Sequence, residues 1–152
     1  MYATVLTIHS WLRWAALALG AGAIVRAYLR RHDADERSPK SRWDTFFMLA
    51  LDLQVFFGLV LYFGFSPFTR EAMNDLAAAV RNPLLRFWAI EHIGAMFGAA
   101  IAVRIGRVLA MNAPTPMARQ RQRLIWFGIA ELIMIAGTPW PGPFGGRPLF
   151  RL

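Results

Sequence analysis

Three long apolar runs constrain this chain more than any other feature of its sequence. They cover about residues 3–28, 43–65 and 84–107. Each is as long as the ~20 residues that a helix needs to cross the hydrocarbon core of a bilayer. A fourth, shorter run covers about 123–138 and ends at "TPWPG". Because lipid offers the backbone no hydrogen-bond partners, we expect these runs to be helices, and the sequence predicts an all-α integral membrane protein.

Composition supports this class and excludes several others. Hydrophobic residues make up 57% of the 152 residues, more than a soluble domain of this size needs. The formal net charge is +8, but the basic residues lie between the apolar runs, so we expect a lipid bilayer and no nucleic acid as partner. The absence of cysteine excludes disulfides, thiolate metal sites and covalently attached haem. We expect one domain, 1–152, with an extended Pro- and Gly-rich tail at 139–152.

The loop charges predict an orientation. The two segments 26–42 and 104–123 hold eleven of the seventeen basic residues, and the other loop and the tail hold five. The positive-inside rule then places those two segments in the cytoplasm and both termini outside. Four helices with modest loops predict an up-down-up-down bundle. In the outer loop, "SPFTREAMNDLAAAV" predicts a short surface helix capped by Ser66 or Thr69.

Several ionisable side chains lie within the apolar runs, where charge is costly and usually functional or paired. They are His9, Arg13, Asp52, Glu91, His92 and Glu131, with Gln54 as a neutral companion. A rise of ~1.5 Å per residue places the histidines and both glutamates in one layer of the outer leaflet. Arg13 and Asp52 then lie just beneath that layer.

The helix order predicts that His9 and His92 approach each other. The first and third helices of such a bundle lie diagonally, at about 11–14 Å, since neighbouring axes are ~8–10 Å apart. Two imidazoles can share one metal across that distance, and a planar macrocycle such as haem b fits if the walls are small. Five glycines are candidates for those walls: Gly20, Gly22, Gly58, Gly94 and Gly98.

The other polar residues have predicted supporting roles. Glu91 and Glu131 are expected to orient the imidazoles or to relay protons. Arg13 is expected to form a structural ion pair with Asp52, while Glu131 or a cofactor carboxylate is an alternative partner.

Plainer interpretations stay open at this point. Each histidine can simply bond a neighbouring helix, so that no cofactor is bound and the polar layer is an ion-pair network. The protein would then be a non-catalytic accessory subunit that binds other membrane subunits. A third interpretation is a non-haem metal centre with His9, His92, Glu91 and Glu131 as ligands.

Four stretches together resemble a known group of proteins. These are "HSWLRW" (9–14), "LDLQVFFGLVLYF" (51–63), "RFWAIEH" (86–92) and "TPWP" (138–141). They resemble small bacterial four-helix membrane proteins labelled cytochrome b-like. The resemblance covers all four helices and includes His9, Arg13, Glu91 and His92. It departs at Asp52, where relatives are expected to have a histidine.

The resemblance implies haem b, electron transfer and the bacterial inner (cytoplasmic) membrane. Combined with the residues, it predicts a haem b-binding electron-transfer subunit rather than a stand-alone enzyme. His9 and His92 are the expected axial ligands in the outer leaflet, and quinol or quinone is a candidate redox partner.

Overall fold

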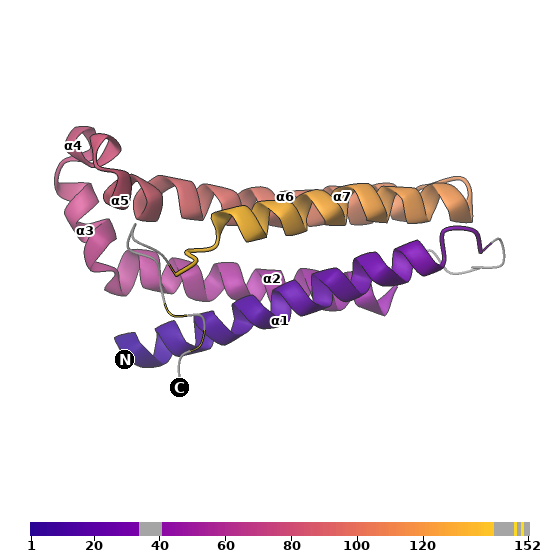
Figure 1. The fold of residues 1–152 in the computed structure, drawn as a ribbon, viewed down its shortest axis with the longest axis horizontal. Helices are drawn as coiled ribbons and strands as arrows, with labels where there is room; N and C mark the ends of the chain where they lie inside the picture. The colour runs from indigo at the N-terminus through magenta and orange to yellow at the C-terminus, as the bar shows by residue number, and fades with distance from the viewer. Residues whose placement is uncertain (34–40, 142–147, 149, 151–152) are drawn as a thin grey trace.

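Four long helices form the body of the protein in the computed structural model (Figure 1). The structure describes residues 1–33, 41–141, 148 and 150, and these contain no strand. The all-α expectation is therefore confirmed for the described residues. Most of the predicted extended tail lies outside them. The long helices are α1 (Tyr2–Leu29), α2 (Arg42–Val60), α6 (His92–Met111) and α7 (Pro116–Gly137).

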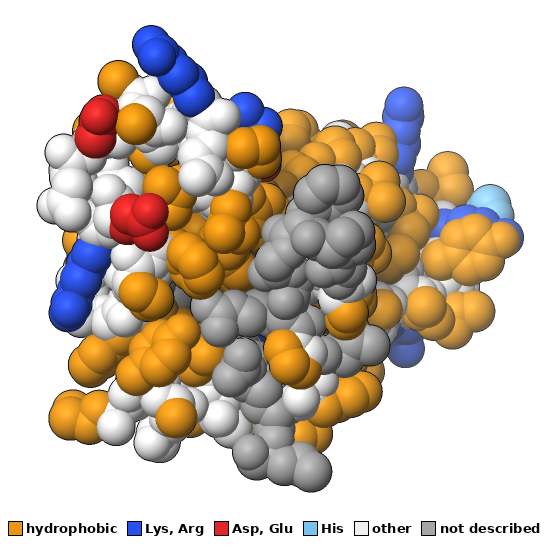
Figure 2. All heavy atoms as spheres, turned by 60° about the vertical axis from the view of Figure 1, so that its left-hand side comes forward, with side chains coloured by type: hydrophobic (Ala, Val, Ile, Leu, Met, Phe, Trp, Pro, Cys, Tyr) orange, Lys and Arg blue, Asp and Glu red, His pale blue; other side chains and the backbone are white. Residues whose placement is uncertain are grey.

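Three segments are long and apolar enough to cross a membrane, by length and composition: Tyr2–Leu29, Arg42–Phe65 and Pro83–Met111. They match the first three predicted runs, and the second and third include the π-helical turns η1 (Leu61–Phe65) and η2 (Phe87–Glu91). Apolar side chains cover much of the flank visible in Figure 2, while charged side chains lie mostly toward the two ends of the molecule. The distribution is that expected of a protein whose middle contacts lipid.

The fourth helix begins earlier than the sequence predicts. Thr115 caps it, since the Thr115 hydroxyl accepts a hydrogen bond from the Ala118 N–H at 3.1 Å. Pro116 occupies the first helical position, where its missing N–H costs nothing. The first turns of α7 therefore hold basic residues that the sequence pattern assigns to a loop.

The helices pack in a closed order around a core of small and aromatic side chains. α1 packs against α2 and α7, and α6 packs against α7 and α2, so α1 and α6 lie diagonally. Phe47 and Phe127 meet edge to face at the centre, with ring centroids 5.6 Å apart. Buried alanines from three helices, Ala16, Ala99 and Ala130, let the backbones approach closely.

Three short helices close the end of the molecule at which α1 begins (Figure 1). They are α3 (Pro67–Asn74), α4 (Leu76–Arg81) and α5 (Pro83–Arg86). Each starts at a side-chain cap: Ser66 accepts from the Thr69 N–H at 3.2 Å, and Asp75 and Asn82 serve the next two helices. The predicted Ser66 cap is confirmed, and α5 runs through η2 directly into α6.

A buried ion pair joins two helices at the opposite end. The Arg123 Nε donates to Asp44 Oδ2 at 2.8 Å, and the two side chains are 1% and 4% exposed. The Arg123 guanidinium also donates to the Gln120 side-chain oxygen at 3.3 Å. Both charges are removed from solvent, and their hydrogen bond links the start of α2 to α7.

Candidate functional site: a histidine pair beside a shared cavity

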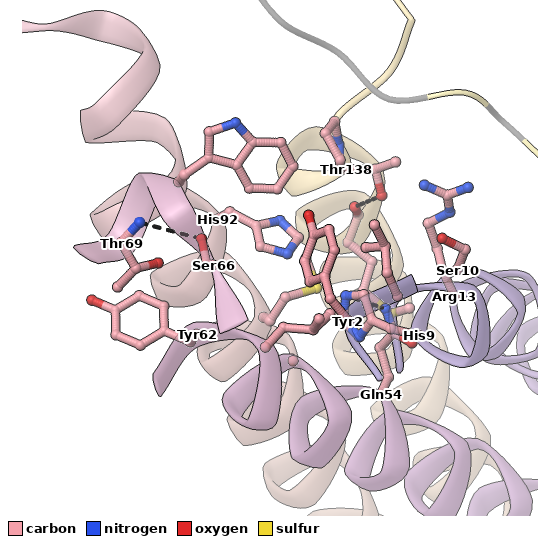
Figure 3. A pocket seen from close by; sticks show the side chains of 17 residues that line it. Tyr2, His9, Ser10, Arg13, Gln54, Tyr62, Ser66, Thr69, His92 and Thr138 are labelled. Atoms are coloured by element: carbon pink, nitrogen blue, oxygen red, sulfur yellow. Dashed lines mark hydrogen bonds between the residues drawn. The ribbon is translucent and has the colours of Figure 1, made fainter. Parts of the chain in front are cut away.

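The structure brings His9 and His92 together from the two diagonal helices. Their ring centroids are 6.3 Å apart, and the ring planes are nearly perpendicular, at 78°. His9 lies in the second turn of α1, and His92 is the first residue of α6, directly after η2. Figure 3 shows that the two rings lie on opposite sides of one cavity. Side chains that are 83 residues apart in the sequence thus form a single local cluster.

Gln54 on α2 fixes the orientation of the His9 ring. The Gln54 amide donates to His9 Nε2 at 3.2 Å, which places the proton of the neutral ring on Nδ1. That Nδ1 atom is buried and has no hydrogen-bond partner among the described residues. Gly58 makes room for the ring, since a Cβ there would stand 3.1 Å from His9 Cε1. His9 therefore presents one nitrogen that is held by the protein and one that is not.

The end of α7 fixes the other imidazole. The His92 Nδ1–H donates to the carbonyl oxygen of Gly137 at 2.7 Å, which leaves Nε2 as a lone-pair acceptor. That carbonyl is available because α7 ends at Gly137, just ahead of Pro139, which cannot continue a helix. The Thr138 hydroxyl donates to the Met134 carbonyl at 2.7 Å and so closes the helix end. The "TPWP" motif thus supplies the partner of His92.

Aromatic side chains and two π-helical turns surround His92. The Trp88 and Phe87 rings lie 5.6 and 5.9 Å from the His92 ring, between centroids. The Tyr62 hydroxyl on η1 donates to the Ala89 carbonyl on η2 at 2.9 Å, so the two turns are linked. π-Helical turns inside α-helices are frequent at functional sites. Here they lie on both sides of the histidine pair.

The cavity beside the two rings takes its lining from all four long helices. It opens to the outside of the bundle, and its wall is mostly apolar. Its polar lining includes Tyr2, Ser10, Arg13, Gln54, Ser66 and Thr69 (Figure 3). A largely apolar cavity with few convergent polar groups is typical of ligand and cofactor sites.

Glu91 does not orient an imidazole. It accepts a hydrogen bond from the Arg86 Nε at 2.6 Å, and both side chains are more than 40% exposed. Consecutive residues of a helix project in different directions, so the residue before His92 faces away from the ring. The role predicted for Glu91 belongs instead to the Gly137 carbonyl.

Glu131 lies away from the histidine layer. A side chain at Gly20 would collide with Glu131 Oε2 and with Phe47, which places the carboxylate beside the middle of α1. Gly20 lies about 16 Å further along α1 than His9, at ~1.5 Å per residue. The prediction that Glu131 shares the depth of the histidines is therefore wrong. It rested on distances from the helix ends, and these do not reveal that the Glu131 side chain extends toward the middle of α1.

Arg13 is buried beside the cavity, but its predicted ion pair with Asp52 is not formed. Asp52 instead accepts from the Arg104 Nη2 at 2.6 Å, on the α2–α6 side of the molecule. Arg13 projects from the buried face of α1, where its guanidinium lies 5.2 Å from the centre of the Trp14 ring. Asp52 faces α6, whereas Arg13 lies on the buried face of α1, so a similar depth is an insufficient guide to pairing.

The other predicted ligands and most of the predicted walls do not adjoin the histidine pair. Among the described residues, no group of three or more His, Cys, Asp or Glu side chains lies close enough to hold a metal ion. The carboxylate-containing metal centre therefore lacks its ligand set in that part of the chain. Of the five glycines named as walls, Gly58 adjoins His9, while Gly20 and Gly22 lie against Phe47 and Trp43.

Three residues that build the surroundings of the histidine pair have no distinctive sequence signal. Gln54 was noted only as a neutral companion, and the Tyr62 and Gly137 contacts were not predicted. A carbonyl partner cannot be identified from residue type, because every residue has one. The Pro residues after Gly137 are the one available signal, since they predict a helix end with unbonded carbonyl groups.

Comparisons with known proteins add no assignment to this geometry. No protein-family model matches the chain, and no curated protein or solved structure is significantly similar to it.

Proposed function

We propose that the chain is a membrane-spanning four-helix bundle of up-down-up-down order with both termini outside. Support comes from three helices that suit a membrane span and from the apolar flank between charged ends. By the positive-inside rule, the basic loops favour a cytoplasmic location for the α1–α2 and α6–α7 connections. The histidine pair then lies in the outer leaflet of a cytoplasmic membrane.

We propose that this pair binds haem b and that the protein transfers electrons. The observation that carries the proposal is the spacing of the two imidazole rings. A metal-bound imidazole nitrogen lies about 2.0–2.1 Å from the ion, and the ring centre lies about 1 Å further, so two rings on one ion stand roughly 6 Å apart. The ring centroids here are 6.3 Å apart.

The donor chemistry of the site also fits such a group. Each ring has one nitrogen bonded to another helix and one nitrogen free for a ligand, as metal-binding histidines usually have. His9 and His92 would hold the haem iron through their free ring nitrogens, and no cysteine would be needed. The wall of the cavity beside the rings is mostly apolar, as the walls of cofactor sites usually are.

The protein's own residues orient the rings and hold their protons. The Gly137 carbonyl keeps a proton on His92 Nδ1 and so leaves Nε2 free. For His9 to bind through Nδ1, its proton has to move to Nε2. The Gln54 side-chain oxygen is buried and without a partner among the described residues, and it accepts a hydrogen bond from that Nε2–H once the amide turns by half a rotation. The haem supplies one-electron redox chemistry when bound.

The decisive experiment is a reduced-minus-oxidised visible spectrum of the protein purified in mild detergent. We expect a b-type α-band that His9→Ala and His92→Ala each abolish, because each removes one axial ligand. His32→Ala is the matched control, since His32 is an exposed residue after α1 and should leave the band unchanged. A folded, colourless protein made with ample haem supply would contradict the proposal and favour the accessory-subunit interpretation.

Quinol is the proposed membrane-soluble redox partner. A second, apolar cavity between α2 and α6 reaches both histidines and is lined by Val55, Leu59, Ile93 and Phe97. It offers an apolar molecule a path from the flank of the protein. The test is the rate at which a short-chain quinol reduces the α-band, which a Val55→Trp substitution should slow by filling the cavity. An unchanged rate would contradict this path.

A further inference from the structure

An ion pair lies on the flank of the protein, within two of the helices that suit a membrane span. The Arg104 Nη2 on α6 donates to Asp52 Oδ1 on α2 at 2.6 Å. The Arg104 side chain is 49% exposed and the Asp52 side chain 37%. The Asp44–Arg123 pair, in contrast, is almost fully enclosed by protein. The flank pair therefore faces outward from the bundle.

The pair lies well inside the membrane-spanning lengths of its helices. Arg104 is about 10 Å from the end of its helix at Met111, and Asp52 is about 15 Å from Arg42, at ~1.5 Å per residue. A long basic side chain at such a position often extends to the nearer interface. The Arg104 side chain instead points away from the nearer helix end at Met111, because its Nη1 donates at 3.0 Å to the carbonyl of Ala100, which is one turn further from that end.

Lipid tails alone are a poor cover for this pair. A charge that faces hydrocarbon is costly, and charged residues in spanning helices almost always face protein or water. An apolar groove continues from the pair along α2 and α6, between Phe56 and Ile101, which are 58% and 57% exposed.

We propose that a second copy of this chain covers the Asp52–Arg104 face, by a two-fold axis along the membrane normal. The charges argue for this occupant. One acid and one base stand side by side at the same depth, so rotation by 180° places each acid opposite the partner's base without changing its depth. The face is thus complementary to itself. The four charges then satisfy one another between protein surfaces. This inference does not depend on haem binding.

Single-cysteine cross-linking in membranes tests the contact directly. The chain has no cysteine, so Ile101→Cys and Phe56→Cys each introduce the sole thiol. We expect copper-phenanthroline oxidation to give a disulfide-linked dimer through at least one of the two positions. Leu132→Cys is the control, since Leu132 on α7 is 68% exposed and lies outside the groove. Cross-linking through neither groove position, or equally through the control, would overturn the proposal.

Charge exchange between copies gives a second, independent test. Asp52→Arg and Arg104→Asp each leave like charges on the face, so either variant alone should lose the dimer in mild detergent. Co-expression of the two, with different tags, should restore a mixed dimer, because each acidic face then meets a basic one. The double variant D52R/R104D should dimerise by itself. Recovery in the double variant without recovery on co-expression would show that the pair acts only within one chain, and would overturn the proposal.

Discussion

At the scale of single residues, the candidate site depends on which nitrogen of each imidazole carries a proton. His92 is fixed by a carbonyl, which can only accept, so its Nδ1 is the donor. His9 is bonded to an amide, which can donate through nitrogen or accept through oxygen. Gln54 is therefore able to support either neutral tautomer of His9. Under the proposed function, this side chain is the positioning residue on which the His9 ligand depends.

Replacing Gln54 by leucine is expected to weaken haem retention. The change removes the only side-chain partner that the described residues offer His9 Nε2, in a site where Gln54 is 2% exposed. Loss of a partner that orients a metal ligand usually costs about 10–100-fold in affinity. Haem content per protein, measured by pyridine haemochrome during dilution, should fall accordingly, and the midpoint potential should shift. Gln122→Leu, a partly exposed amide near the start of α7, should change neither. Unchanged retention in Gln54→Leu would remove Gln54 from the site.

At the scale of elements, helix ends and turns position the site, and the sequence predicted them unevenly. The long helices were predictable because apolar length and internal backbone bonding leave few alternatives. The start of α7 was missed because its first turns are rich in arginine and therefore resemble a loop. The meeting of His9 and His92 was predictable from depth and helix order. Depth failed for Glu131 and Asp52, because it does not specify the direction in which a side chain leaves its helix.

Close packing of α6 against α7 is expected to be sensitive at Gly137. A Cβ at Gly137 would stand 2.6 Å from the Ala95 Cβ and 3.0 Å from Met96 Cε, one turn from His92. Gly137→Ala should therefore destabilise the protein by about 1–3 kcal/mol, as overpacking does. Gly128→Ala on the same helix is the matched control, since nothing lies within 4 Å of the added atom. Thermal unfolding followed by circular dichroism should separate the two variants. Equal melting temperatures would show that the α6–α7 contact can relax.

At the scale of the whole molecule, two polar clusters occupy opposite ends of an apolar core. The histidine pair links α1, α2, α6 and α7 at one end, through Gln54 and Gly137. The Asp44–Arg123 pair links α2 to α7 at the other. The sequence did not predict the second cluster, because its members are 79 residues apart and each lies at the end of an apolar run, where a charge is expected to face water. Only the assembled fold removes both side chains from solvent.

The buried Asp44–Arg123 pair is expected to stabilise the fold without affecting the histidine site. Asp44→Asn leaves a charged guanidinium in a site where Arg123 is 1% exposed, and such a loss usually costs about 3–5 kcal/mol. Asp33→Asn is the control, because Asp33 faces Arg30 at 3.8 Å with both side chains at least 40% exposed, and exposed pairs contribute about 0–1 kcal/mol. Denaturant unfolding in detergent should show a large loss of unfolding free energy for the first variant and little for the second.

Below its unfolding transition, Asp44→Asn should keep any α-band of the native protein, since the two clusters share no residue. A spectrum altered in folded Asp44→Asn would instead show that the two ends of the bundle are coupled. Equal stability of Asp44→Asn and Asp33→Asn would mean that water reaches Arg123.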